Sequence, residues 1–133
     1  MASKATKGPL GTPRVRTFRA EGGTLTRGMA VIPGTADDQV KAPATASTGN
    51  LKVVGIVAET ALEGAPVAIV TEGECEAVVA AAVALGDSLM TVAAAGKVEP
   101  TTTDNDGVFA VAVSAATTDG DSAIVDVKGP SRY

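Results

Sequence analysis

The chain has 133 residues, which is enough for one domain, and 45% of them are hydrophobic but only 2% are aromatic. It has no histidine and a single cysteine, which excludes histidine-based acid–base catalysis, an intrachain disulfide and a cysteine-based zinc site. The longest apolar run, residues 77–85, is far shorter than the roughly 20 residues of a membrane span, and the N-terminus lacks the apolar segment of a secretory signal. We therefore expect a protein of a reducing compartment, without a membrane anchor or a cofactor.

The net charge of −4 hides an uneven distribution along the chain. Five basic residues precede the first acidic residue, Glu21: Lys4, Lys7, Arg14, Arg16 and Arg19. Residues 1–17 contain Pro9 and Pro13 and few apolar side chains, so they cannot bury enough surface to offset the entropy of ordering. We expect a basic, extended, flexible N-terminal arm over residues 1–17 and a single β-rich domain over residues 18–133.

The domain is predicted to consist of short strands separated by turn residues. β-Branched content and alternation of apolar and polar residues mark the strands, and Gly22-Gly23 and Pro33-Gly34 mark turns. In chain order the predicted strands are Leu25–Ile32, a short segment around Val40, Val53–Glu59, Pro66–Thr71, Glu74–Val79, Ser88–Val92, Lys97–Glu99, Val108–Ser114 and Ala123–Lys128. Residues 80–85 are predicted to form one short helical turn. The pattern predicts an all-β fold, a small barrel or sandwich.

A weak internal repeat runs through the chain. Gly55-Ile-Val-Ala58, a turn at Gly64 and Val67-Ala-Ile-Val70 are similar to Gly107-Val-Phe-Ala110, a turn at Gly120 and Ala123-Ile-Val-Asp126. A strand that begins with glycine, at Gly28 and at Gly86, precedes each half. The repeat predicts two similar halves that close one small barrel around a pseudo-dyad.

Three segments carry residues associated with chemistry. Gly86-Asp87-Ser88-Leu89 matches the nucleophile block of one class of serine esterases, but the chain has no histidine to serve as base, so a turn into a strand is favoured. Asp104-Asn105-Asp106-Gly107 begins like a calcium loop but lacks its later glycine and glutamate. Glu72, Glu74 and Glu76 alternate, which predicts either an acidic stripe for a cation or basic partner or, as the favoured interpretation, a solvated strand face. Cys75 between them is predicted to be a small buried hydrophobe.

The basic arm has three interpretations. It binds nucleic acid by neutralising phosphates, it orders on an acidic protein surface, or it is only a solubilising tail. Five charges with one nearby aromatic residue, Phe18, are few for a nucleic-acid site, so the protein surface is favoured over nucleic acid.

The domain from Phe18 to Lys128 resembles the small decoration (cement) proteins of tailed-phage capsids. The resemblance is carried by the order and spacing of these blocks: Gly55-Ile-Val-Ala58, Gly64-Ala-Pro-Val-Ala-Ile-Val70, Glu72-Gly73, Gly86-Asp87-Ser-Leu89, Lys97-Val98, Gly107-Val-Phe-Ala110 and Ala123-Ile-Val-Asp-Val127. It implies a compact β-barrel-like domain, a homotrimer bound outside the expanded capsid where capsomers meet.

The family's role is to brace the shell against the pressure of packaged DNA. The resemblance therefore implies a virion protein made in the bacterial host cytoplasm, with the major capsid protein and further copies of itself as partners. It implies no enzymatic activity, no cofactor, no metal, and no direct contact with nucleic acid or membrane. The residues expected to contribute to the capsid contact are Lys4, Lys7, Arg14, Arg16, Phe18 and Arg19.

Two other classes of function remain open from the sequence. One is a non-catalytic cellular β-domain that binds partners, such as a surface or adhesin module, which would be a monomer. The other is an enzyme that works with carboxylates alone, which would need a carboxyl group with a strongly raised pKa in a cleft.

Overall fold

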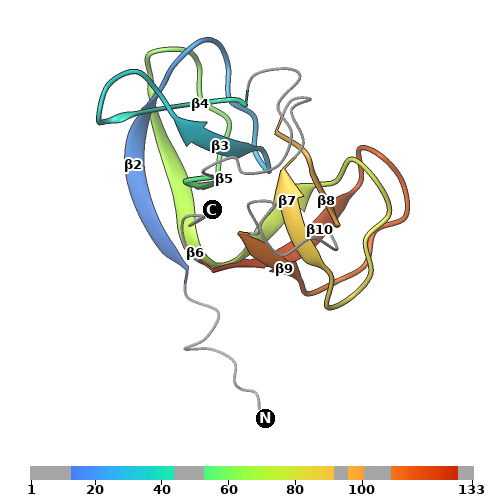
Figure 1. Ribbon diagram of the computed structural model, residues 1–133. Coiled ribbons are helices and arrows are strands. Elements are labelled where there is room, and N and C mark those ends of the chain that lie inside the picture. The colour runs from blue at the N-terminus through green and yellow to red at the C-terminus, as the bar shows by residue number, and fades with distance from the viewer. Residues whose placement is uncertain (1–12, 44–52, 92–95, 101–108, 129–133) are drawn as a thin grey trace.

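The computed structural model describes residues 13–43, 53–91, 96–100 and 109–128, and these form strands, turns and bends without a helix (Figure 1). The predicted all-β fold is therefore confirmed. The strands are β2 (Arg14–Ala20), β3 (Ala30–Pro33), β4 (Gln39–Lys41), β5 (Gly55–Val57), β6 (Pro66–Val78), β7 (Ser88–Thr91), β8 (Val98–Pro100), β9 (Ala110–Ala112) and β10 (Ser122–Val127).

The first half of the chain closes into a barrel of five strands, which we call the N-terminal barrel. The strand order is β2-β4-β3-β5-β6, and β2 also pairs antiparallel with the first part of β6, which closes the ring. Closure removes most free strand edges, which would otherwise be open to pairing with other chains. Its core is built from small and medium aliphatic side chains, among them Leu25, Val31, Val40 and Ile69, each 1% exposed or less.

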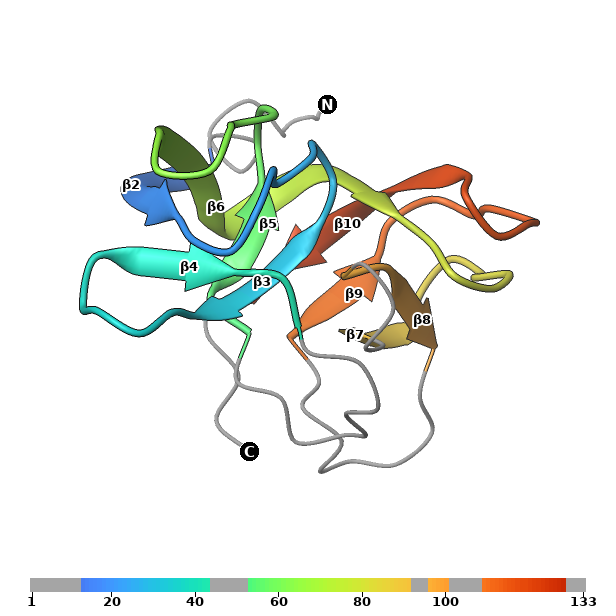
Figure 2. The same cartoon turned by 90° about the horizontal axis from the view of Figure 1, so that it is seen from above.

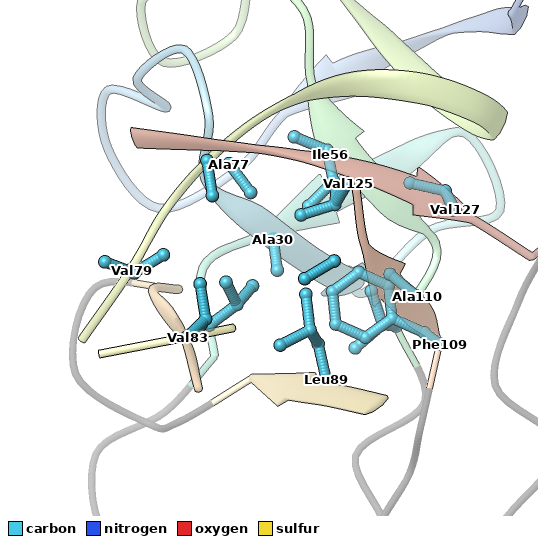
Figure 3. Close-up of a cluster of buried hydrophobic side chains, with 14 of the residues drawn as sticks. Ala30, Ile56, Ala77, Val79, Val83, Leu89, Phe109, Ala110, Val125 and Val127 are labelled. Atoms are coloured by element: carbon cyan, nitrogen blue, oxygen red, sulfur yellow. The ribbon is translucent and has the colours of Figure 1, made fainter. Parts of the chain in front are cut away.

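The second half forms a corresponding ring, which we call the C-terminal ring. It consists of residues 74–78 of β6 with β10, β9, β7 and β8. A parallel bridge between Val79 and Val98 joins its two ends, and the Ala80 amide donates to the Val98 carbonyl at 2.7 Å. Its core contains Phe109 together with Leu89, Val125 and Val127 (Figure 3).

The two halves repeat each other down to individual backbone hydrogen bonds. The Gly28 amide donates to the Val57 carbonyl, and the Gly86 amide donates to the Ala112 carbonyl, both at 2.9 Å. The isolated bridge between Leu25 and Ala61 has its counterpart between Val83 and Ala116. The order in which β3, β4 and β5 pair with one another is also the order of β7, β8 and β9. The internal repeat predicted from the sequence is therefore present in the structure, but one of its blocks was aligned wrongly, because the counterpart of Gly55 is Ala110 and not Gly107.

The expectation that both halves share one barrel is wrong, because each half closes on itself and the two lie side by side (Figure 2). The single long strand β6 makes this possible. Its first part pairs with β2 and its last part with β10, so that one strand belongs to both rings. The bend between the two parts lies at Gly73, whose φ of +106° is a conformation that other residues rarely adopt.

Several predicted boundaries differ from the structure; the strand predicted over Leu25–Ile32, for example, is limited to Ala30–Pro33. Pro66–Thr71 and Glu74–Val79 form one continuous strand, because Gly73 bends β6 without ending it. Residues 80–85 are not a helical turn but a bent segment in which Val83 pairs with Ala116. The predicted boundary between arm and domain, after residue 17, falls inside β2, which begins at Arg14 because its residues pair with β6 from Glu72 back to Pro66.

Candidate partner-binding site at the end of the N-terminal barrel

β2 determines where the basic residues of the sequence lie. Arg16 is opposite Ile69 and Phe18 is opposite Val67 in the antiparallel pair with β6. Directly opposed residues share one face of a sheet, and both Ile69 and Val67 are core residues. Arg16 and Phe18 therefore face the interior side of the barrel wall, whereas Val15, Thr17 and Arg19 lie on the other side.

Arg16 and Phe18 contact each other on this inner face. The Arg16 guanidinium carbon lies 5.3 Å from the centre of the Phe18 ring, within the range of a cation–π interaction. Phe18 is partly buried and packs against the core of the N-terminal barrel. The ring is anchored, and it fixes the position of an arginine head that is otherwise exposed to solvent.

Arg14 lies two residues before Arg16, at the start of β2. Its Nε is 3.5 Å from Glu72 Oε1, but both side chains are at least half exposed, so the pair contributes little to stability. Its carbonyl accepts a hydrogen bond of 3.2 Å from the Thr71 hydroxyl. That bond lies at a register shift in the pairing of β2 with β6, where the strand begins.

Arg19 has a different environment from the other two arginines. Its guanidinium lies 3.6 Å from a carboxylate oxygen of Asp38 and donates to the Gly64 carbonyl at 3.1 Å. It therefore ties β2 to two turns of the barrel. Of the six predicted contact residues, Arg14 and Arg16 line one pocket and Arg16 contacts Phe18, whereas Arg19 lines a second pocket together with Phe18. Lys4 and Lys7 lie outside the described residues.

A pocket of about 200 Å³ opens beside these residues at the end of the barrel. It is lined by Arg14, Arg16, Val54, Thr71 and Glu72. Val54 is half-buried and packs against the barrel core, and Thr71 is buried with its hydroxyl bonded to the chain. Val54 and Thr71 were not among the residues predicted from the sequence, because neither carries a charge or belongs to a motif.

The alternating glutamates of β6 have partners within the chain. Glu72 faces Arg14, and Glu76 Oε1 lies 3.2 Å from a guanidinium nitrogen of Arg27. The described part of the chain contains no group of three or more histidine, cysteine, aspartate or glutamate side chains that could hold a metal ion. These pairs match the favoured interpretation of a solvated strand face.

The Gly86-Asp87-Ser88-Leu89 segment is a turn that leads into β7. Gly86 has a φ of +90°, and a carboxylate oxygen of Asp87 accepts a hydrogen bond of 2.8 Å from the Ala84 amide. Ser88 is the exposed first residue of the strand. The structural interpretation of this motif is therefore the right one. The segment Asp104–Gly107 lies outside the described residues.

Among the described residues, two carboxyl groups have shifted pKa values, and both shifts are downward. The backbone amide and hydroxyl of Thr35 donate to Glu21 and lower its pKa, and the hydroxyl and amide of Thr118 do the same for Asp121. Hydrogen bonds to a carboxylate favour its charged form. A general acid at neutral pH needs the opposite shift, so these two groups act as acceptors in turns.

Cys75 packs against a core, and its thiol ionises less readily than that of a free cysteine. It packs against the core of the C-terminal ring, and burial, followed by the charges of Asp126 and Glu76, raises its pKa from 9.0 to about 12. Because only the thiolate reacts, we expect native protein at pH 8 to be alkylated by iodoacetamide about a hundredfold or more slowly than urea-unfolded protein. Mass spectrometry of timed samples measures both rates. Equal rates would mean that Cys75 is accessible and ionised in the fold.

The comparisons with known proteins found a similarity in fold. No protein-family model and no curated protein matches the chain. The structure is similar to the crystal structure of the N base of the head fiber protein gp8.5 of bacteriophage phi29, with a TM-score of 0.65 and 17% sequence identity. The similarity covers 92% of this chain and 100% of that one. It shows a shared fold, and it extends over both halves of the repeat. In the described residues, no helix is long and apolar enough to cross a membrane.

Proposed function

We propose that this protein is a structural component of a phage head that binds the outer surface of the expanded capsid at capsomer junctions and stabilises it. The observation that carries the proposal is the fold. The N base of a phage head fiber protein has a similar fold over the whole of its crystallised chain. The resemblance of the sequence to decoration proteins points to the same location independently of that structure.

The physical mechanism of such a protein is linkage. A ligand that binds the assembled lattice, but not the separate subunits, stabilises the lattice in proportion to the logarithm of its concentration over its dissociation constant. A homotrimer that contacts several subunits at once gains avidity. No catalytic group is required, and the candidate site at the end of the N-terminal barrel has the features of a binding surface: a fixed arginine, a partly buried aromatic ring and a small pocket.

The shape of the molecule fits this role. The strand β2, which carries Arg14, Arg16 and Arg19, starts at the end of the N-terminal barrel where the pocket opens (Figure 1). The partner surface that this end contacts would have to be acidic, because this end is basic. The rest of the chain has an excess of acidic residues and carries no comparable basic segment. The major capsid protein is the proposed partner.

The test is co-sedimentation with expanded capsids that lack this protein, prepared from the phage that encodes it, with unexpanded procapsids as the control. We expect saturable binding to expanded capsids only, at one trimer per site, and a higher melting temperature of the decorated shells. Light scattering after size-exclusion chromatography gives the oligomeric state in solution. Failure to bind either form, together with a monomer in solution, would instead favour a cellular binding module.

A further inference from the structure

The internal repeat allows equivalent residues of the two halves to be compared. A residue that differs from its core-packing counterpart in the other half is a candidate for a role other than folding. In the N-terminal barrel β2 pairs with β6, and in the C-terminal ring the last part of β6 pairs with β10 in the same way. Arg16 is opposite Ile69, and its counterpart Cys75 is opposite Val125. An arginine in one half therefore occupies the place of a core-packed cysteine in the other.

The residue next to this position also differs between the halves. The Val54 amide donates to the Val31 carbonyl at 2.8 Å, and the Phe109 amide donates to the equivalent Leu89 carbonyl at 3.1 Å, so Val54 and Phe109 are counterparts. Phe109 is 1% exposed and fills the end of the C-terminal ring (Figure 3). Val54 is too small to fill the equivalent space.

A third residue beside this space is polar in the N-terminal barrel and apolar in the C-terminal ring. Continuing the same strand register, Thr71 corresponds to Val127, which is buried and apolar. The C-terminal ring is thus closed at this end by phenylalanine, valine and cysteine. The N-terminal barrel has valine, threonine and arginine there, and a pocket of about 200 Å³ remains, which is also lined by Arg14 and Glu72, a pair whose charges offset each other. Folding does not require this arrangement, since the same backbone is closed by an apolar plug in the other half.

The arginine at the mouth of this pocket has unused binding capacity. Among the described residues Arg16 forms no ion pair, and its guanidinium lies over the ring of Phe18. A guanidinium that stacks on a ring keeps the N–H groups at its edge available, and these match the two oxygens of a carboxylate. Val54 supplies an apolar wall for the methylene groups that carry such a carboxylate in a glutamate side chain.

We propose that the pocket bounded by Arg16, Val54 and Thr71 binds an acidic side chain of a protein partner. The identification of that partner as the capsid subunit rests on the function proposed above, but the chemistry of the pocket does not. A protein carboxylate is favoured over the phosphates of a nucleic acid, because the rest of the chain is strongly acidic and repels a polyanion, whereas a single side chain enters locally.

The test compares two pocket variants with a control variant that, like Arg16→Gln, loses one positive charge, but at a position outside the pocket. Arg16→Gln removes the guanidinium, and Val54→Phe introduces into the N-terminal barrel the plug that the C-terminal ring already has. Lys128→Gln removes one positive charge at the corresponding end of the C-terminal ring, where Lys128 pairs with Asp126 at 2.8 Å. Melting curves of all variants identify any that do not fold.

We expect Arg16→Gln and Val54→Phe each to weaken binding to expanded capsids by about tenfold or more, the effect of losing one charge-assisted hydrogen bond to a desolvated group. Lys128→Gln should bind like the wild type. If the wild type binds capsids and the pocket variants bind equally well, the pocket proposal is wrong while the proposed function stands.

A second measurement separates the two proposals if no capsid is bound. A short peptide with one central glutamate is titrated into isotope-labelled protein, and the amide signals of Val54 and Thr71 are followed by NMR. Shifts that saturate, that disappear in Val54→Phe and that are absent with the glutamine peptide support the pocket. Unchanged signals, or equal shifts with inorganic phosphate, would overturn its assignment to a carboxylate side chain.

Discussion

Replacement of Phe109 by alanine is expected to lower the free energy of unfolding by about 3–5 kcal/mol, the usual cost of removing a buried phenylalanine side chain. Phe109 is 1% exposed and is the largest fully buried side chain among the described residues. The core around it otherwise consists of alanine, valine, leucine and isoleucine side chains, with Cys75 packed against it. No neighbouring side chain is long enough to refill the space, so the cavity should persist. Urea unfolding followed by far-UV circular dichroism measures the change.

Two further variants define the cause of that loss. Phe109→Leu keeps most of the volume and should cost about 1–2 kcal/mol. Val15→Ala, at a side chain that is 47% exposed, should change stability by no more than about 0.5 kcal/mol. A loss below about 1 kcal/mol for Phe109→Ala would mean that the ring does not depend on this side chain for its packing.

The same variant tests whether the two halves unfold together. The core around Phe109 includes Ala30, Val53 and Ile56, which belong to the N-terminal half of the chain. β6 is also shared by both rings. We therefore expect one transition, with the midpoint shifted and the cooperativity unchanged, rather than the loss of one half alone.

The strands could be predicted from the sequence because their local signal is strong. β10 carries Ala123, Val125 and Val127 on its buried face, as the alternation of the sequence indicated. β9 was harder: its alanines are buried while Val111 is only half-buried. The inside of a small closed ring has room for small side chains, and the adjacent Phe109 takes up the space at its end. Composition alone therefore does not tell which face of such a strand is buried.

The long strand β6 shows where local signals fail. Glu72-Gly73-Glu74 has the composition of a turn, and the two predicted strands were separated at residues 72–73. In the structure the polar segment stays in the sheet because it exchanges one partner strand for another at Gly73. A side chain on Gly73 would also lie 2.7 Å from the Cα of Pro13, so glycine is needed for close approach as well as for its φ. Such long-range pairing leaves no mark in the local sequence.

The candidate site was predictable only in part. The charge of the arm indicated Arg14 and Arg16, which alternate with Val15 and Thr17 along β2. The separation of Arg19 from them depends on its contacts with Asp38 and Gly64, which are distant in sequence. Val54 could not be found from the repeat as the sequence aligns it, because that alignment places Val57 opposite Phe109, and only the strand pairing shows that Val54 is the counterpart.

Gly55→Val is expected to open the N-terminal barrel and to cost about 3 kcal/mol, the upper end of the usual range for overpacking. Gly55 is buried in β5, and a Cβ at this position would overlap the carbonyl oxygen of Val70 on β6. That carbonyl belongs to the backbone and cannot move aside as a flexible side chain would. β5 would have to separate from β6 at the pairs Ile56–Val70 and Val57–Ile69, which hold the barrel closed.

The repeat provides the control for this prediction. Ala110 begins β9, as Gly55 begins β5, and its Cβ is accommodated in the core of the C-terminal ring. Ala110→Gly should therefore cost only about 1 kcal/mol, from backbone entropy and one lost methyl group. Urea unfolding of both variants measures the contrast. If Gly55→Val were as stable as Ala110→Gly, β5 and β6 would be able to separate without loss, and the close contact between them would not be what selects glycine at this position.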